Sequence, residues 1–193
     1  VLYAKGNINL LNKLGIAVVG CRLSTDYGNN ISTQFSYILS KYNINVISGL
    51  AKGIDTSSHL GALKANGNTI AVIGSGLDII YPNENKYLFT EIIEKGGLII
   101  SEYVPGTKPI PKNFPQRNRI ISGISNGVLI VEAKEKSGSL ITAEFALEQG
   151  KEVYAIPGNI NCKNSMGTNE LIKQGAKMVT SVSEILEDFL KIF

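Results

Sequence analysis

The sequence predicts an α/β fold in which a parallel β-sheet is covered by helices on both faces. The candidate strands are short, continuous apolar runs such as GIAVVG and GVLIVE, a pattern typical of strands buried on both faces. Segments with helical spacing separate these runs, as the crossover connections of a parallel sheet require. The length of 193 residues fits one domain, 1–193, with a well-buried core.

In the first half of the chain, glycine punctuates the predicted elements. The first strand runs into Gly20, and Gly74 and Gly76 break the third. Between the first two strands, Phe35 and Leu39 lie on one face of a helical pattern. We therefore expect a lead-in segment at 1–14, strands at 15–20, 44–48 and 69–73, and helices at about 29–42 and 56–66.

The second half repeats the same alternation. Glycines stop several helical patterns, and a proline-rich segment over 104–115 is expected to be a loop that feeds the next helix. We expect helices at about 84–95, 116–125, 140–149, 168–174 and 183–190, and strands at 98–101, 127–132, 152–156 and 178–180.

Composition restricts the class of protein. The net charge of +3 permits an anionic partner without requiring one. No apolar run reaches the roughly 18 residues of a membrane span, and the first residues do not lead us to expect a signal peptide. Two cysteines and one histidine do not suggest a disulfide framework or a metal site. The expectation is a cytoplasmic protein with reduced thiols and without a metal or other cofactor.

The basic stretch IPKNFPQRNRIISG, residues 110–123, holds two of the three arginines of the chain. Lys112, Phe114, Arg117 and Arg119 fall within eight residues, and no acidic residue occurs between Tyr103 and Val131. Arginine offers a planar set of donors suited to phosphate, and an exposed aromatic ring can stack on a base. The stretch therefore suggests a single-stranded nucleic-acid site. In the alternative, Phe114 is core and the arginines cap a helix or pair with distant acids.

Several glycine-rich or polar loops follow predicted strands, as does the basic stretch. Because ligands bind at the carboxyl ends of parallel strands, these loops should share one edge of the sheet. Arg22 lies in one of them, although it could instead form a salt bridge to Asp26 or Glu102. The loops are 20–22, 49–53, 74–76, 101–102 and 134–139.

The loop KEKSGSLIT, residues 134–142, is a second candidate anion site. Ser137, Gly138 and Ser139 would lie at a helix start, where backbone N–H groups are free, although an ordinary serine cap would give the same pattern. Gly74 and Gly76 form only half of a dinucleotide fingerprint, and GLAKGID does not match a P-loop.

Other polar residues carry weaker functional signals. His59 is expected to be buried and structural, because no nucleophile pattern accompanies it. Asp55 is expected to cap a helix or pair with a cation. Glu132 and Glu144 could form an acid/base pair, or they could simply orient the arginines.

The ordered motifs closely resemble the DNA-processing protein A family, also called Smf. They include SGLAKGIDTSSHLGAL, GSGLDIIYPNEN, FPQRNRIISG and VLIVEAKEKSGSLITAEFALEQGKEVYAIPG, and the resemblance runs from about Leu2 to Val182. It implies an extended Rossmann-like three-layer α/β/α fold with a mostly parallel sheet. It also implies a non-enzymatic protein that binds single-stranded DNA, protects incoming DNA in natural transformation, helps to load the RecA recombinase and forms a homodimer.

The resemblance also assigns site residues. The positions that match the family's DNA contacts and motifs are Arg22, Lys52, Lys112, Phe114, Arg117, Asn118, Arg119, Ser137, Gly138 and Ser139. Lys52 stands where many members have arginine, which keeps the charge but loses the planar fork. The family's N-terminal helical domain and C-terminal winged-helix domain are not recognisable in the sequence, so the chain is expected to be an isolated core or a short member.

Two other function classes remain as alternatives. A phosphoribohydrolase-like enzyme would use Glu132, Arg119 and Glu144, but its glycine-rich loop is replaced here by SGSLIT. A regulatory module that binds a small nucleotide is the third possibility.

Overall fold

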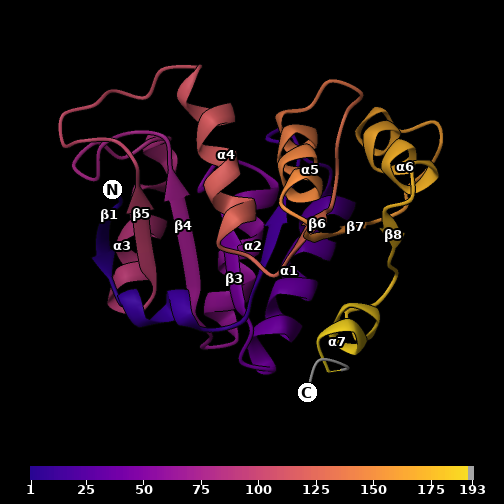
Figure 1. Ribbon diagram of the computed structural model, residues 1–193, viewed down its shortest axis with the longest axis horizontal. Coiled ribbons are helices and arrows are strands. Elements are labelled where there is room, and N and C mark those ends of the chain that lie inside the picture. The colour runs from indigo at the N-terminus through magenta and orange to yellow at the C-terminus, as the bar shows by residue number, and fades with distance from the viewer. Residues whose placement is uncertain (191–193) are drawn as a thin grey trace.

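The structure, a computed structural model, describes residues 1–190. Its strands are β1 (Tyr3–Gly6), β2 (Gly15–Val19), β3 (Asn45–Ser48), β4 (Thr69–Ile73), β5 (Leu98–Ser101), β6 (Gly127–Ile130), β7 (Glu152–Ala155) and β8 (Lys177–Met178). They form one sheet in the order β1-β5-β4-β3-β2-β6-β7-β8. All neighbours pair in parallel except β1, which runs antiparallel to β5 (Figure 1).

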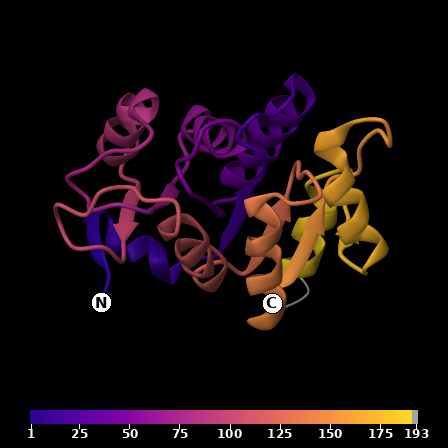
Figure 2. The ribbon, with the colours of Figure 1, turned by 90° about the horizontal axis from the view of Figure 1, so that it is seen from above.

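Helices cover both faces of this sheet, as the sequence predicts. They are α1 (Asp26–Lys41), α2 (Ile54–Lys64), α3 (Lys86–Glu94), α4 (Asn113–Gly123), α5 (Gly138–Glu148), α6 (Met166–Lys173) and α7 (Ser183–Leu190), with short 3-10 turns η1 (Ile8–Asn12), η2 (Asn83–Asn85) and η3 (Lys163–Ser165). Figure 2 shows α1, α2 and α3 on one side of the sheet and α4 and α5 on the other. The α/β/α layering is therefore confirmed.

The core divides into two layers because the strands bury both faces. Val128 and Ile130 of β6 pack with side chains of α4, α5 and α6 on one face. Leu129 of the same strand packs on the other face with residues of α1, α2 and α7. Successive residues of a strand point to opposite faces, so an unbroken apolar run is what a sheet covered on both sides needs.

The lead-in segment contains an edge strand that the sequence analysis did not predict. Tyr3 to Gly6 pair with Leu98 to Ser101 of β5, and only Tyr3 among the four is even half-buried. Apolar content does not mark this strand. Gly6, with φ +112°, turns the chain where a Cβ would collide with the carbonyl of Gly97.

The helix of the basic stretch begins earlier than expected, at Asn113 instead of residue 116. Proline is tolerated in the first turn of a helix, where its missing N–H would have no partner, so Pro115 does not delay the start. Asn113 is buried, and its side-chain amide donates to the carbonyl of Gly74 at 3.0 Å. This bond attaches the start of α4 to the end of β4, with the consequence that Phe114 and Arg117 turn toward the sheet edge.

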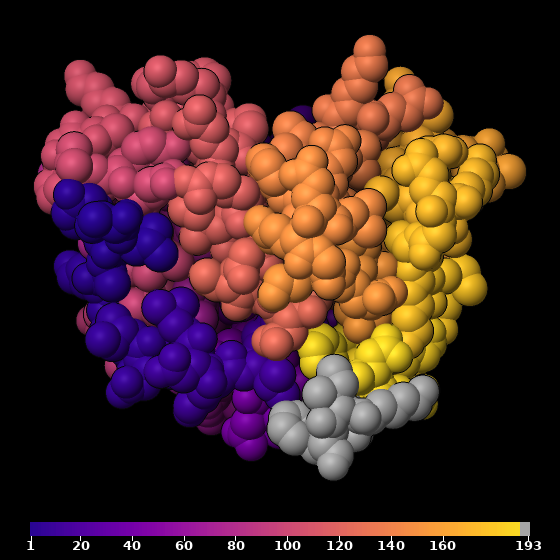
Figure 3. Space-filling view, viewed as in Figure 1, coloured from indigo at the N-terminus to yellow at the C-terminus, as the bar shows by residue number. Residues whose placement is uncertain are grey.

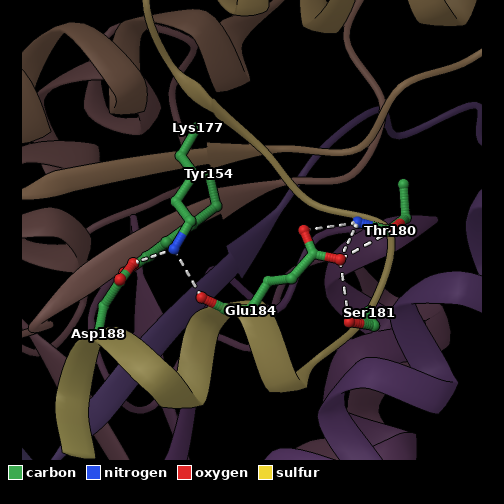
Figure 4. Close-up of polar contacts among 6 residues, drawn as sticks. All are labelled: Tyr154, Lys177, Thr180, Ser181, Glu184 and Asp188. Carbon is green, nitrogen blue, oxygen red and sulfur yellow. Dashed lines mark hydrogen bonds and ion pairs between the residues drawn. The ribbon is translucent and has the colours of Figure 1, made fainter. Parts of the chain in front are cut away.

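Helix α7 is fastened to the sheet by a polar cluster shown in Figure 4. The Nζ atom of Lys177 donates to the backbone carbonyl of Glu184 at 2.7 Å and to the Asp188 carboxylate at 2.6 Å. The Tyr154 hydroxyl donates to the same carboxylate at 3.1 Å, and its burial raises the pKa of the phenol. The cluster joins β7, β8 and α7.

Candidate nucleic-acid interface

A cavity of about 560 Å³ opens at the carboxyl ends of the central strands. It lies at the switch point of the sheet: α1 leads from β2 to β3 on one face, and α5 leads from β6 to β7 on the other. Its walls come from the loops after β2, β3 and β6 and from α4. Figure 3 shows a notch at the top of the molecule between the pink and orange segments that form two of these walls. The expected meeting of loops at one sheet edge is confirmed.

Arg22 and Phe114 both line the cavity and contact each other. The Arg22 guanidinium carbon lies 4.9 Å from the centroid of the Phe114 ring, within cation–π range. Arg22 is exposed, and it forms no ion pair or hydrogen bond with residues 1–190. The alternative salt bridge to Asp26 or Glu102 is not formed. A cation without an acidic partner is available to an anionic ligand.

Arg117 is buried and only 4% exposed, although the basic stretch suggested an arginine that binds phosphate. Its guanidinium donates to the carbonyl of Gly49 at 2.7 Å and also to the carbonyl of Val72. Burial lowers the pKa of Arg117 to about 10, so it is still a cation at neutral pH. It braces the ends of β3 and β4 beneath Phe114, whose ring centroid is 5.8 Å away.

Asp55 lies in the first turn of α2 beside this buried arginine. Its carboxylate accepts the N–H groups of Gly49 at 3.1 Å and Ala51 at 3.3 Å. Burial raises the pKa of Asp55, and the charge of Arg117 opposes that rise. A Cβ on Gly49 would meet both Arg117 and Asp55 at 2.7 Å, so glycine is needed where the two charged groups approach the loop.

The loop before α5 presents a helix N-terminus to the cavity. The Ser137 hydroxyl caps α5 by accepting the N–H of Ser139, and the two hydroxyls lie 2.8 Å apart. The side-chain amide of Asn118 donates to the carbonyl of Gly138 at 3.1 Å and ties this loop to α4. A Cβ on Gly138 would meet nothing within 4 Å, so the space above it is open to a ligand. Free N–H groups at a helix start suit an anion.

Lys134 and Lys136 add two cations that the sequence analysis included in the loop but did not single out. Both are exposed and line the cavity, and no ion pair is recorded for either within the described chain. Their position directly after a central strand could have identified them, because that position predicts the ligand edge of the sheet.

Glu132 holds the loop that carries Arg22. It is 1% exposed, and it accepts the Thr25 N–H at 3.0 Å, the Thr25 hydroxyl and the Asn164 amide at 3.2 Å. Glu144 is exposed on α5. The two glutamates therefore do not form an acid/base pair, and Glu132 positions the start of α1 instead.

The five expected cations do not share one cavity. Lys52 lines a smaller adjoining hollow with Arg22 and is paired with Glu84. Lys112 is exposed on the loop before α4, and Arg119 is paired with Glu102. Among the described residues that line the main cavity, neither Lys112 nor Arg119 occurs. Arg22 is the expected residue that reaches the cavity as a free cation.

His59 is structural, as the sequence analysis expected. It is fully buried, and its Nδ1 lies 2.6 Å from the Thr69 hydroxyl. That hydroxyl donates its own proton to the carbonyl of Val46. Nδ1 must therefore carry a proton, which it donates to the Thr69 oxygen. Nε2 has no partner in the described residues, and burial lowers the pKa of His59 to about 3.

Two further kinds of feature are absent from residues 1–190. No helix there has the length and apolar character to cross a bilayer, and no cluster of three metal-ligating side chains occurs.

Cys21 lines the cavity as a free thiol, and burial raises its pKa. It is therefore protonated at neutral pH and is a weak nucleophile.

The fold and the site define a three-layer Rossmann-like α/β protein with an open cavity, lined by cations and an aromatic ring, at its switch point. A model of the family described as DNA recombination-mediator protein A matches residues 1–190, and the chain belongs to this family. Protein Smf of Escherichia coli is 46% identical over 187 residues, which cover 97% of this chain and 50% of that protein. The DNA processing protein DprA of Streptococcus pneumoniae is 47% identical over 98% of this chain and 66% of its own length.

Solved structures agree with this assignment. The S. pneumoniae protein superposes with a TM-score of 0.90 at 47% identity, covering 96% of this chain and 65% of that one. DNA processing protein A of Helicobacter pylori, described for its single-stranded DNA binding mode, gives a TM-score of 0.89 at 33% identity and covers 100% and 87%. A molybdenum cofactor binding protein of Rippkaea orientalis, 16% identical with a TM-score of 0.62, shares the fold alone. The chain spans about half to two thirds of the curated relatives named here.

Proposed function

We propose that this chain binds single-stranded DNA in the cavity and acts, without catalysis, as a recombination mediator in natural transformation. The observation that carries the proposal is the set of unpaired cations around a half-exposed aromatic ring. Arg22, Lys134 and Lys136 line the cavity with Phe114, and in the part of the chain that the structure describes none of the three has an acidic partner. Cations serve the phosphates, and a ring can stack on a base.

The sites for phosphate and base are separate in this arrangement. A phosphate would lie at the start of α5, where Ser137, Gly138 and Ser139 offer N–H groups and hydroxyls to the cavity. A base would stack on Phe114. Asn118 and Arg117 would fix the positions of the two sites relative to each other. Outside the cavity, the DNA strand would contact Lys52, Lys112 and Arg119. Phosphate contacts and stacking carry little sequence information, so base preference should be weak.

Family membership and the single-stranded DNA binding of the H. pylori relative support a single-stranded ligand. We further propose that the chain protects incoming DNA, helps to load the RecA recombinase on it and acts as a cytoplasmic homodimer. Analytical ultracentrifugation of the protein tests the dimer. RecA filament assembly on DNA coated with a single-strand-binding protein tests the loading, which should be faster with the protein present.

An enzymatic function is disfavoured by Glu132. A phosphoribohydrolase-like reaction would need this carboxylate free for the substrate, whereas its oxygens accept hydrogen bonds from Thr25 and Asn164. Cys21 is protonated, and His59 is buried away from solvent. Release of a free base from a nucleoside monophosphate would revive the enzyme proposal.

Fluorescence anisotropy with a labelled oligo-dT tests the proposed binding. Arg22→Ala should weaken binding at least tenfold. Lys64→Ala is the matched control, because it removes the same charge from an exposed position at the end of α2, at the opposite edge of the sheet. Unlabelled duplex should compete poorly, since its bases are not free to stack. Equal affinity of Arg22→Ala and wild type would contradict the proposed site.

A further inference from the structure

A smaller hollow adjoins the main cavity and contains an aromatic residue that the sequence analysis did not single out. Tyr81, in the loop after β4, lines it with Arg22, Lys52 and Phe114. The hollow measures about 50 Å³, too little to enclose a nucleobase. A ligand would therefore lie over the rings at its rim.

Much of the Phe114 ring is already in contact with protein. Arg22 and Arg117 lie 4.9 Å and 5.8 Å from its centroid, and a Cβ on Gly74 would meet the ring at 3.1 Å. The Tyr81 and Phe114 centroids are 5.6 Å apart with planes tilted by 43°. This spacing is that of rings in direct contact, so no base fits between them.

Tyr81 is the more open of the two rings, 45% exposed. No hydrogen bond of its hydroxyl is recorded within residues 1–190, whereas the hydroxyls of Tyr27, Tyr103 and Tyr154 all donate to protein oxygens. An exposed ring that rests on Phe114 and is not held by its hydroxyl presents a free aromatic face at the cavity mouth.

We propose that Tyr81 is a second base-stacking residue, which holds the base next to the one on Phe114. This inference rests on the proposed binding of single-stranded DNA. The neighbouring cation Arg22, which has no acidic partner within residues 1–190, favours a polyanionic strand over an uncharged aromatic ligand. The loop carbonyls of Gly49 and Gly74 already accept bonds from Arg117 and Asn113, so the hollow offers few groups to read base edges and should tolerate any sequence.

Two substitutions of Tyr81 test the proposal, one that removes the aromatic ring and one that keeps it. Tyr81→Leu should weaken binding of oligo-dT by about five- to 140-fold, the range expected for one lost stacking contact. Tyr81→Phe should restore binding, because the ring carries the effect. An abasic oligonucleotide of equal length offers phosphates without bases, and its weaker binding should be the same for Tyr81→Leu and wild type.

A tryptophan reporter gives an independent readout, because the sequence contains no tryptophan. Tyr81→Trp should show fluorescence quenching on addition of oligo-dT and little on addition of the abasic strand. Tyr42→Trp is the control, since Tyr42 is exposed at the end of α1, at the opposite edge of the sheet. Its fluorescence should not change.

The outcomes separate this inference from the function on which it rests. If Tyr81→Leu binds oligo-dT as wild type does while Arg22→Ala does not, the second stacking residue is refuted and the DNA site stands. Equal loss on oligo-dT and on the abasic strand also overturns the inference, because the ring would then only shape the site. If wild type binds neither strand, the proposed function fails and the inference fails with it.

Discussion

Arg22 and Arg117 contact the same phenyl ring, but their surroundings give them different roles. Arg22 is exposed and Arg117 is 4% exposed with its guanidinium bonded to two carbonyls. Arg117→Met would leave the carbonyls of Gly49 and Val72 without these donors. It should lower the free energy of unfolding by about 2–4 kcal/mol, whereas Arg22→Ala, which loses only an exposed cation–π contact, should lower it by less than about 1 kcal/mol. Urea unfolding of both variants measures the difference, and similar values would contradict the division of roles.

Gly138→Ala tests the phosphate site, because it should leave the stability of the fold unchanged or higher while it lowers the affinity for DNA. A Cβ there meets no protein atom within 4 Å, and alanine is a better helix former than glycine, by up to about 1 kcal/mol in a helix interior and by less at the first position of α5. Gly138→Ala should therefore keep or slightly raise the melting temperature. It should also weaken oligo-dT binding, because the methyl group occupies the space where a phosphate approaches the start of α5. Unchanged affinity would show that no phosphate lies at this position.

His59 should make stability depend on pH. Its pKa is about 3 in the folded chain against an ordinary 6.5, so the unfolded chain binds more protons between these values. Stability should therefore fall as pH falls from 6.5, by up to about 1.4 kcal/mol per pH unit. Asp55, whose pKa is raised, acts in the opposite sense. His59→Gln leaves Asp55 in place and should lose the histidine contribution, which urea unfolding at pH 6.5, 5.5 and 4.5 would measure. Parallel profiles for variant and wild type would contradict this account.

At the scale of elements, the central strands could be predicted and the helix starts less well. The predicted boundaries of β4 and β5 are confirmed, because an apolar run bounded by glycine or serine marks a buried strand clearly. Helices α1 and α4 each begin three residues earlier than expected. Thr25 caps α1 and is itself held by Glu132, 107 residues away. Asn113 holds the start of α4 through Gly74. Sequence spacing does not reveal contacts of this kind.

Loss of the polar cluster that holds α7 on the sheet should destabilise this helix locally without changing the cavity. Lys177→Met removes the donors to the carbonyl of Glu184 and to Asp188. Amide exchange in α7 should become faster, while oligo-dT affinity stays that of wild type. Lys173→Met is the control, because Lys173 is exposed and pairs with Glu170 at 3.5 Å. Equal exchange in the two variants would show that the cluster does not hold α7.

At the scale of the whole molecule, the sheet edge that carries the site could be predicted, but the roles of individual cations could not. Parallel topology places the loops after β2, β3 and β6 together, and the cavity confirms this. Whether an arginine lies free, as Arg22 does, or is buried, as Arg117 is, depends on packing between segments that are distant in the sequence. Tyr81 was missed for the same reason, since only the folded chain places its ring against Phe114.

The salt dependence of single-strand binding tests the central claim most directly. Each phosphate neutralised by a cation on a single strand contributes about −0.7 to the slope of log affinity against log salt concentration. Replacing Arg22, Lys134 and Lys136 together with alanine should therefore reduce the magnitude of that slope by about 2 relative to wild type. Replacing Lys13, Lys41 and Lys64, which are exposed before β2 and at the ends of α1 and α2, should not. A slope that is the same in the triple variant and in wild type would mean that the strand binds elsewhere, and it would contradict the account.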